Sequence, residues 1–339
     1  MTEQLRPIVV TPEMLAQGER LAKIFMPYAS KQQLDYFKKT PDQQSAQLVH
    51  YTTAEAALNI IRSKRFWMRN TVCMADYREV QHGFSIFKSF FDDAKKRKKF
   101  TDALDTCSVG VAVEGIDLFN NAWNNTVQME TYITSLSEHQ ESENVHGRLS
   151  MWRAFGTSPA RVALVLNIPS DSLASLALGI QFSPVAYLSE KAVHNVVDGV
   201  ITSIYADCAY LRGLDRRILV QMVFRMLLFG VVCLKHEGFH EEREWRAIYQ
   251  PRIQSSQLMK PATKVIAGGV PQIIYEIPMD VKVSAELADL DFVKMFNHLI
   301  VGPTPYVWPM YEAFVNALTD AGIADATKRL VPSGIPIRA

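Results

Sequence analysis

Residues 132–137 read Tyr-Ile-Thr-Ser-Leu-Ser and residues 161–166 read Arg-Val-Ala-Leu-Val-Leu, and these two stretches decide the fold class. Both are rich in β-branched and apolar residues, which is typical of strands. Residues 244–249 alternate in character and stop before Pro251, so they are a third strand candidate. Shorter stretches of the same kind lie at 47–51, 66–69, 272–277 and 298–301.

Helical patterns lie between these strands. Capping patterns mark three helix starts, at Thr11-Pro12, at Thr52 with Glu55, and at Asp76 with Glu79. The first of these helices should run to about Tyr28, and long apolar-faced helices are expected over 191–212 and 215–235.

Helices and strands interspersed without regular alternation favour an α+β fold over a doubly wound sheet. We predict a single compact domain with a small mixed or antiparallel sheet surrounded by helices. Residues 1–46 should form an N-terminal helical extension and residues 47–339 an α+β catalytic-like domain.

Composition excludes several classes of protein. Of 339 residues, 48% are hydrophobic and 21% charged, which excludes a disordered, collagen-like or disulfide-scaffold chain. Lysine plus arginine (36) nearly balance aspartate plus glutamate (35), so no broad surface for a polyanion is expected.

Targeting signals are equally weak. The start, Met1 to Pro7, does not resemble a signal peptide, and the most apolar stretch, 218–234, falls short of the ~20 residues that span a bilayer. The four cysteines are scattered, so we expect reduced thiols in a cytoplasmic protein with no membrane segment.

The sequence His236-Glu237-Gly238-Phe239-His240 fits the His-Glu-x-x-His motif of zinc metallopeptidases. On a helix, the two histidines would share a face and bind Zn²⁺, and the glutamate would act on the bound water. Gly238 weakens a helix, and a strand pattern begins a few residues later. We therefore expect no metal, and the metallopeptidase is kept as an alternative.

The run from Lys95 to Lys99 is the other conspicuous pattern. Clustered cations can bind phosphates, but they also suit the C-terminal end of a helix, and the solvated helix end is favoured. The sequence has no P-loop, no dinucleotide-binding glycine fingerprint and no nucleophile elbow.

Polar residues on the short strands could line one cleft. His50 lies on the first strand, and Arg69-Asn70 closes the second. Ser135 and Ser137 alternate on the third strand, and Glu242 and Glu244 alternate at the start of the last.

These residues and their surroundings resemble the bacterial family catalogued as domain of unknown function 2971, over roughly residues 47 to 338. The family usually has asparagine where this chain has Ala75, and proline where it has Tyr77. The family name implies no activity. We call the short segments that carry the resemblance stations. They are His50-Tyr51-Thr52, Arg69-Asn70, Met74-Ala75-Asp76-Tyr77-Arg78-Glu79, Ser135-Leu136-Ser137-Glu138, Met151-Trp152, Glu242-Arg243-Glu244-Trp245-Arg246, Ile300-Val301-Gly302-Pro303 and Ser333-Gly334-Ile335-Pro336-Ile337-Arg338.

The order of histidine, Ser-x-Ser and late Glu-x-Glu is also similar to that in ADP-ribosyltransferases, which use NAD as a substrate. That resemblance implies that Glu244, or Glu242, is catalytic and that Ser135 braces it. His50 would hold the adenosine-side ribose, with Thr52 beside it, and Arg69 would face the pyrophosphate. The full set of residues expected to bind NAD is His50, Tyr51, Thr52, Arg69, Asn70 and Ser137. Tyr51 or Trp152 would stack on a ring of the substrate.

The chemistry that this resemblance implies is coherent. Cleavage of the nicotinamide–ribose bond creates an oxocarbenium-like centre, which an ionised carboxylate stabilises. We therefore expect an NAD-consuming enzyme, as in a toxin or antiphage effector, whose macromolecular acceptor, protein or nucleic acid, stays open. A non-catalytic module that binds a nucleotide or a protein is the remaining alternative.

Overall fold

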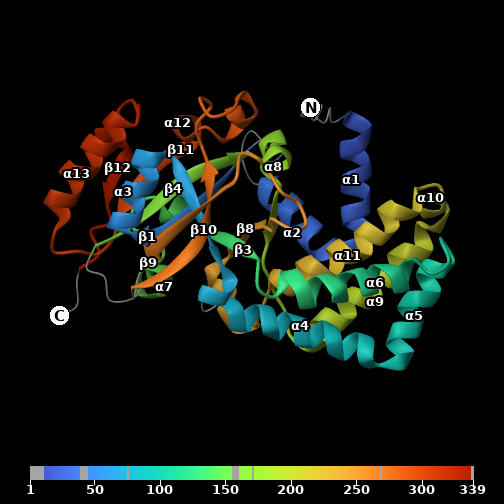
Figure 1. Ribbon diagram of the computed structural model, residues 1–339. Coiled ribbons are helices and arrows are strands. Elements are labelled where there is room, and N and C mark those ends of the chain that lie inside the picture. The colour runs from blue at the N-terminus through green and yellow to red at the C-terminus, as the bar shows by residue number, and fades with distance from the viewer. Residues whose placement is uncertain are drawn as a thin grey trace.

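A computed structural model describes residues 11–38, 45–74, 76–154, 160–169, 172–266 and 269–336. The chain forms a single compact α+β domain with a mixed sheet (Figure 1). The early residues Met1 to Pro7, Ala75, and the last station's Ile337 and Arg338 lie outside the described residues, as do the side chains of Asp76 and Tyr77.

Within the described residues, ten strands make the main sheet, and a short parallel pair stands apart from it. The strands of the main sheet are β1 (Ser45–Thr53), β2 (Arg65–Asn70), β3 (Tyr132–Glu138), β4 (Arg161–Pro169), β5 (Ile180–Pro184), β8 (Glu244–Tyr249), β9 (Lys260–Ile266), β10 (Val270–Pro278), β11 (Phe296–Val301) and β12 (Leu330–Pro332). The separate pair is β6 (Ala186–Tyr187) with β7 (Leu234–Lys235).

Most of the helices gather beside one half of the sheet, on the right in Figure 1, and the others cover the far half. The helices are α1 (Pro12–Phe25), α2 (Pro27–Phe37), α3 (Ala54–Ser63), α4 (Asp76–Asp92), α5 (Ala94–Asp105), α6 (Val111–Ala122), α7 (Leu149–Ala154), α8 (Leu173–Leu178), α9 (Glu190–Ala206), α10 (Cys208–Arg212), α11 (Arg216–Val232), α12 (Phe292–Met295) and α13 (Val307–Asp320).

The sheet divides at β3. Strand β8 pairs with β3 along residues 132–137, so β1 and β2 must share the opposite edge of β3. Strand β1 pairs with β3 only at Ser137 and Glu138, and β2 pairs with it only at Tyr132 and Ile133. From there β1 continues beside β4, and β2 continues beside β10. We call this divergence the fork.

Two large apolar cores lie on either side of this arrangement. One includes residues from both of the diverging branches, Met68 and Ile277 on β2 and β10 and Leu164 on β4, together with Ile61 of α3 and Phe314 of α13. The other belongs to the helical half, and Ile133 of β3 and Ile248 of β8 join it. The helical half therefore packs on the face of β3 and β8 that carries these two isoleucines.

Helix α11 explains the most apolar stretch of the sequence. Ten of its apolar residues are buried, and Gln221 and Arg225 lie exposed, four positions apart on one face. The interpretation of this stretch as a buried helix is confirmed. No helix in the described residues is both long enough and apolar enough to span a membrane.

Several expectations about the fold were wrong. The sheet is not small, since it has ten strands, and the helices do not surround it evenly. The first helix ends at Phe25, because Pro27 starts a second one. Thr53, not Thr52, caps α3, because its hydroxyl accepts a hydrogen bond from the Ala56 amide.

The basic run also lies at the opposite helix end from the one expected. Helix α4 ends at Asp92, and the lysines from Lys95 onward occupy the first turns of α5. The Asp93 carboxylate accepts hydrogen bonds from the Lys95 and Lys96 amides and so caps α5. A cap and a new helix therefore separate this run from α4.

The approach of α4 to α11 gives a first prediction. A Cβ atom on Gly83 would lie 2.5 Å from the Val231 carbonyl oxygen, which is backbone and cannot move aside. Gly83→Ala should therefore lower the free energy of unfolding by on the order of 1–3 kcal/mol. Gly199→Ala is the control, because Gly199 also lies in a helix but has nothing within 4 Å of the added carbon. Urea denaturation of both variants tests this, and equal effects would contradict it.

Candidate active site

A buried cluster of charges lies where β8 meets the helical half of the molecule. The Lys235 ammonium lies 3.2 Å from Glu79, 2.6 Å from Glu242 and 2.9 Å from Glu244. The Arg246 guanidinium contacts Glu244 at 2.8 Å and Glu79 at 2.7 Å, and it donates a further hydrogen bond to the Val232 carbonyl. The Ser135 hydroxyl donates to the Glu244 carboxylate.

Accessibility differs sharply among the three carboxylates. The side chain of Glu244 is 6% exposed, whereas Glu79 is 19% and Glu242 is 30% exposed. The two cations are buried as deeply as Glu244, because the Arg246 side chain is 0% and the Lys235 side chain 6% exposed. Glu242 and Glu79 therefore form the solvent side of the cluster, and Glu244 lies beneath them.

Electrostatics keep the cluster ionised. Burial alone would raise the pKa of Glu244, but Arg246, Lys235 and the hydrogen bonds lower it to about 2. Burial would lower the pKa of Lys235, yet Glu244 and the other carboxylates raise it above its usual value. Three carboxylates against two cations leave these five side chains with one net negative charge at neutral pH.

The strand register explains why Ser135 reaches Glu244. On β3 and β8, Ser135 lies opposite Arg246 and Ser137 lies opposite Glu244. Residues opposite each other in a sheet point to the same face, and so do residues two apart in a strand. The expected side chains Ser135, Ser137 and Glu244 therefore share the face that carries the cluster.

His50 lies in the fork itself. Its Nδ1 is 3.0 Å from the Ser135 carbonyl oxygen, at the part of β3 that lies between its pairings with β1 and β2. Burial lowers the pKa of His50, and the hydrogen bond to Ser135 opposes this shift. Because a carbonyl only accepts, Nδ1 carries the hydrogen and Nε2 of the neutral ring is an acceptor. The ring packs edge-on against Phe66, with 5.1 Å between centroids.

Arg69 and Asn70 lie at the end of β2, and both have partners. The Arg69 guanidinium donates to the Gln272 side chain at 3.3 Å and to the Cys73 carbonyl at 3.1 Å. The Asn70 side chain accepts from the Val72 amide and donates to the Met129 carbonyl. Arg69 lies opposite Ile133, so it shares the face of Ser135, whereas Asn70 acts as a helix cap.

Tyr51 and Thr52 do not join His50 as a group. Tyr51 is 2% exposed, its hydroxyl accepts from the Arg148 amide, and its ring packs edge-on against Trp152 at 4.9 Å. Trp152 is also 2% exposed, so neither ring presents a face to a substrate, and the expected stacking role was wrong. Thr52 is half-buried and points to the side of β1 that carries His50, opposite Tyr51.

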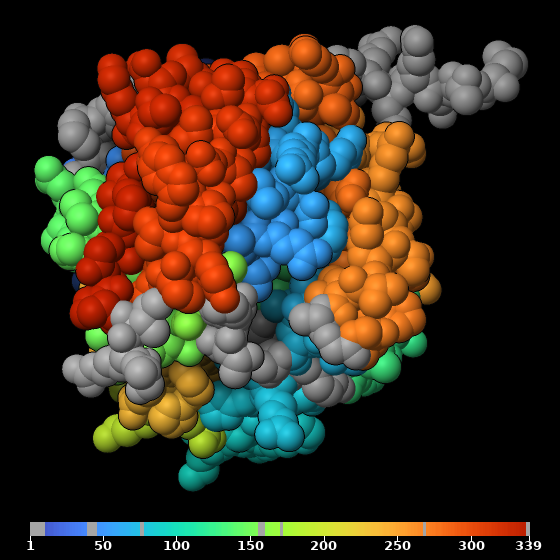
Figure 2. Space-filling model, turned by 90° about the vertical axis from the view of Figure 1, so that its left-hand side faces the viewer, coloured from blue at the N-terminus to red at the C-terminus, as the bar shows by residue number. Residues whose placement is uncertain are grey.

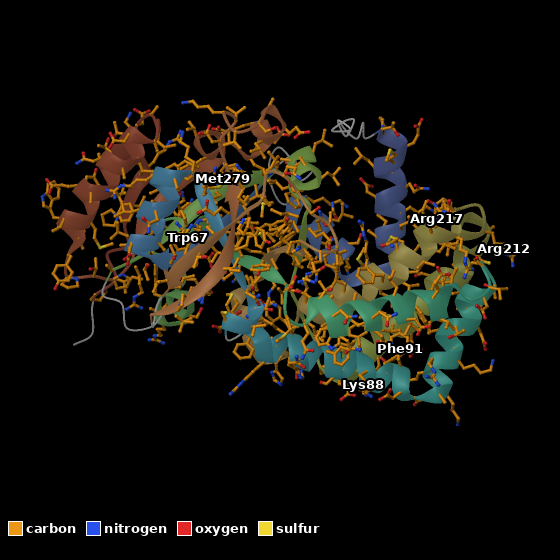
Figure 3. All side chains as sticks on the ribbon, viewed as in Figure 1. Trp67, Lys88, Phe91, Arg212, Arg217 and Met279 are labelled. Carbon is orange, nitrogen blue, oxygen red and sulfur yellow. The ribbon has the colours of Figure 1, made fainter. Side chains whose placement is uncertain are left out.

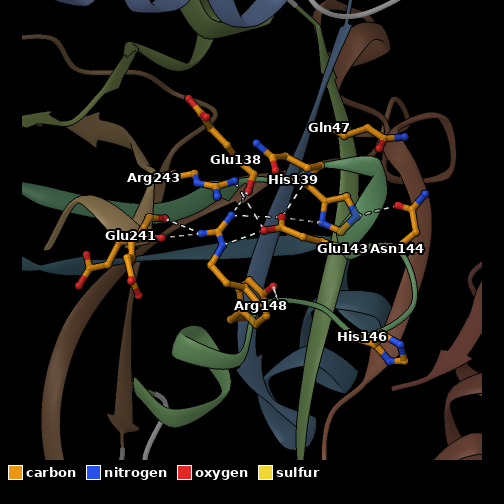
Figure 4. A network of polar contacts seen from close by, with 12 residues as sticks. Gln47, Glu138, His139, Glu143, Asn144, His146, Arg148, Glu241 and Arg243 are labelled. Atoms are coloured by element: carbon orange, nitrogen blue, oxygen red, sulfur yellow. Dashed lines mark hydrogen bonds and ion pairs between the residues drawn. The ribbon is translucent and has the colours of Figure 1, made fainter. Parts of the chain in front are cut away.

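A second polar network adjoins the cluster through residues 241 and 242 (Figure 4). Arg148 pairs with Glu143 at 3.0 Å and donates to the main-chain carbonyls of Glu138, Glu241 and Glu242. It therefore fixes the backbone of the segment that carries the Glu242 side chain.

Histidines at the edge of this network give a second prediction. Burial lowers the pKa of His298 to about 4, and burial also lowers the pKa of His139, whose ring lies 5.6 Å away. The unfolded chain takes up a proton at His298 near pH 6.5 and the folded chain does not, so stability falls as the pH falls through this window.

From pH 6.5 to 5, we expect His298 alone to lower the free energy of unfolding by about 1.5 kcal/mol. Glu244 loses its own contribution to the free energy of unfolding only at a pH below its ordinary pKa of 4.5. The window from pH 6.5 to 5 therefore lies above the pH range in which Glu244 affects stability. Urea denaturation across the window measures the slope, and His298→Asn should flatten it. An unchanged slope in that variant would assign the pH dependence to other groups.

The His-Glu-x-x-His motif does not lie on an α-helix. Residues Glu237–Glu242 form a 3₁₀ helix, in which residues three apart, not four, share a face. His236 caps this turn by accepting from the Gly238 amide, and the His240 ring contacts the Glu237 carbonyl. Within the described ranges, no group of three or more candidate ligands could hold a metal ion.

Sequence reasoning missed two members of the cluster. Glu79 was interpreted as part of a capping box, but its carboxylate binds Lys235 and Arg246. Lys235 precedes the histidine motif, and no local pattern marks it. One signal in the sequence could have assigned Glu79 to the site: like Glu244 and Arg246, it lies in a segment that resembles the domain-of-unknown-function family.

Figure 2 shows a hollow in the surface between the blue segment that holds β1 and α3 and the cyan segment of α4. The two bordering segments carry His50 and Glu79.

No family model, no curated protein and no solved structure matches this chain.

Proposed function

We propose that this protein is an NAD-consuming enzyme of the ADP-ribosyltransferase type, whose reaction takes place beside the charge cluster. The observation that carries the proposal is the hydrogen bond from Ser135 to the ionised Glu244, at the fork. Serine bracing of a late strand-borne glutamate is the arrangement that the resemblance implies. A role as a toxin or antiphage effector belongs to the same proposal.

The charge of the cluster suits this chemistry. When the nicotinamide–ribose bond breaks, positive charge develops on the ribose, and nicotinamide leaves as a neutral molecule. A cluster that is net negative and little exposed to solvent stabilises such a positive centre. The buried ion pairs hold the carboxylates of the cluster in place before the reaction. No general acid is required.

The roles of the individual residues follow from accessibility. Glu242 is the more exposed carboxylate, and Glu244 is the more deeply held one, so Glu244 supplies a fixed field and Glu242 lies closer to a bound substrate. The Nε2 acceptor of His50 would receive a ribose hydroxyl in the fork. Arg69 would turn its guanidinium from Gln272 and Cys73 towards the pyrophosphate.

Membership in the domain-of-unknown-function family is part of the proposal. Three of its stations meet in one cluster although they are distant in sequence: the first contributes Glu79, the second Ser135, and the third both Glu244 and Arg246. The zinc metallopeptidase has no comparable support, because its motif lies on a 3₁₀ turn.

The test is the release of nicotinamide from NAD by the purified protein, with cell lysate added as a source of acceptors. We expect His50→Ala to weaken NAD binding by about tenfold, since it removes one hydrogen bond to the substrate. Thr53→Ala, which removes only a helix cap on the same strand, is the control and should leave NAD binding unchanged. A wild-type protein that neither binds nor consumes NAD would refute the proposal.

A further inference from the structure

A pocket lies in the helical half, along the part of α4 that follows Glu79. It is enclosed by α4, α5, α6 and α11 and has a volume of about 190 Å³. Four phenylalanine rings, two cationic side chains and one carboxylate, that of Asp92, lie among the residues that line it. The rings are Phe84, Phe87, Phe91 and Phe119, and the cations are Lys88 and Arg97.

The interior suits a flat apolar group. A dry cavity of roughly 150 Å³ holds a benzene ring, so this pocket has room for one ring with a small substituent. Aromatic side chains favour another ring in offset or edge-on contact. Phe84 stacks on Trp123 with 4.0 Å between centroids and 3° between planes, which fixes the orientation of one wall.

The cationic side chains suit an anion. Lys88 is paired with Asp92, its neighbour one turn along α4, and Figure 3 shows Lys88 and Phe91 close together on this helix. Arg97 is exposed, and among the described residues its guanidinium has no hydrogen bond or ion pair. Other cations of the same run are engaged, Lys96 with His194, Lys98 with Asp102 and Lys99 with Asp198.

We propose that this pocket binds a small aromatic carboxylate. The ring of the ligand lies among the phenylalanines, and its carboxylate accepts two hydrogen bonds from the Arg97 fork. The Asn120 side chain, which also lines the pocket, adds a polar group. This proposal does not depend on the NAD-consuming activity, because none of the pocket residues belongs to the charge cluster.

The experiment is a calorimetric titration of the full chain with benzoate and with its neutral analogue benzamide. Arg97→Gln should weaken benzoate binding by on the order of 10- to 100-fold, because a charge-assisted pair is lost. The same variant should change benzamide binding less than about twofold. Lys95→Gln is the matched control, since Lys95 lies on the same helix and does not line the pocket.

Thermal unfolding of each variant checks that the fold is intact, which we expect because Arg97 and Lys95 are exposed. The absence of saturable benzoate binding up to about 10 mM would overturn the proposal. So would equal affinity of the wild type and Arg97→Gln for benzoate. An equal loss in Lys95→Gln would also overturn it, because the attraction would then be a general effect of the basic run.

Discussion

Arg246→Met should lower the free energy of unfolding by about 3–5 kcal/mol, which is the largest loss of stability that we expect from any single charge removal in this protein. The guanidinium is fully buried and binds Glu244, Glu79 and the Val232 carbonyl. Methionine fills a similar volume but leaves the Glu244 carboxylate in the interior with one cation fewer beside it, so that Lys235 and the Ser135 hydroxyl must stabilise its charge. Urea denaturation at pH 7 measures the change.

Arg252→Met is the matched control for this measurement. Arg252 pairs with Glu130 at 2.7 Å, a distance like those in the cluster, but its side chain is 67% exposed. An exposed pair contributes only about 0–1 kcal/mol, because water solvates both charges when they separate. Similar losses in the two variants would show that burial of the cluster does not determine its contribution.

A double variant separates the cost of a broken pair from the value of an intact one. Removing Glu244 together with Arg246 takes away one charge of each sign, so Glu244→Gln in the Arg246→Met background should cost less than it does alone. Additive losses would mean that the two side chains do not interact energetically, in spite of the 2.8 Å contact.

Strand positions were predictable from the sequence because they depend on local composition. The stretches 132–137 and 244–249 coincide closely with β3 and β8, since β-branched and apolar residues fit a buried sheet wherever it lies. The Ser-x-Ser alternation also predicted that Ser135 and Ser137 lie on one face of β3, because the side-chain period of a strand is two.

The partners of these residues were not predictable in the same way. Glu79 and Arg246 are 167 positions apart, so no spacing rule connects them, and the local capping pattern suggested a different role for Glu79. Likewise, the fork depends on where β1 and β2 leave β3, which is a property of three strands together. Contacts between residues distant in sequence therefore determine how the candidate site is assembled, whereas local sequence patterns predict only the individual strands that contribute to it.

Glu244→Gln should reduce the rate of nicotinamide release by on the order of 10²–10³-fold, if the cluster stabilises the positive charge that develops on the ribose. Glutamine keeps the shape of the side chain and can still accept from Ser135. It removes the negative charge, however, and thereby makes the five-residue cluster neutral. The substitution also lowers the stability of the fold, because Arg246 and Lys235 lose a buried partner. Rates must therefore be compared at a temperature where both proteins are folded.

Two neighbouring variants make this result interpretable. Glu241→Gln alters an exposed side chain next to Glu242 and should leave the rate unchanged. Glu242→Gln removes a 30% exposed carboxylate whose ion-pair partner, within the part of the chain that the structure describes, is Lys235. Lys235 keeps Glu79 and Glu244, so this variant should cost less stability than Glu244→Gln. A large loss in Glu242→Gln with a small one in Glu244→Gln would move the catalytic role to Glu242. Full activity in both variants would exclude the cluster as the source of catalysis, because each substitution alone removes its net charge.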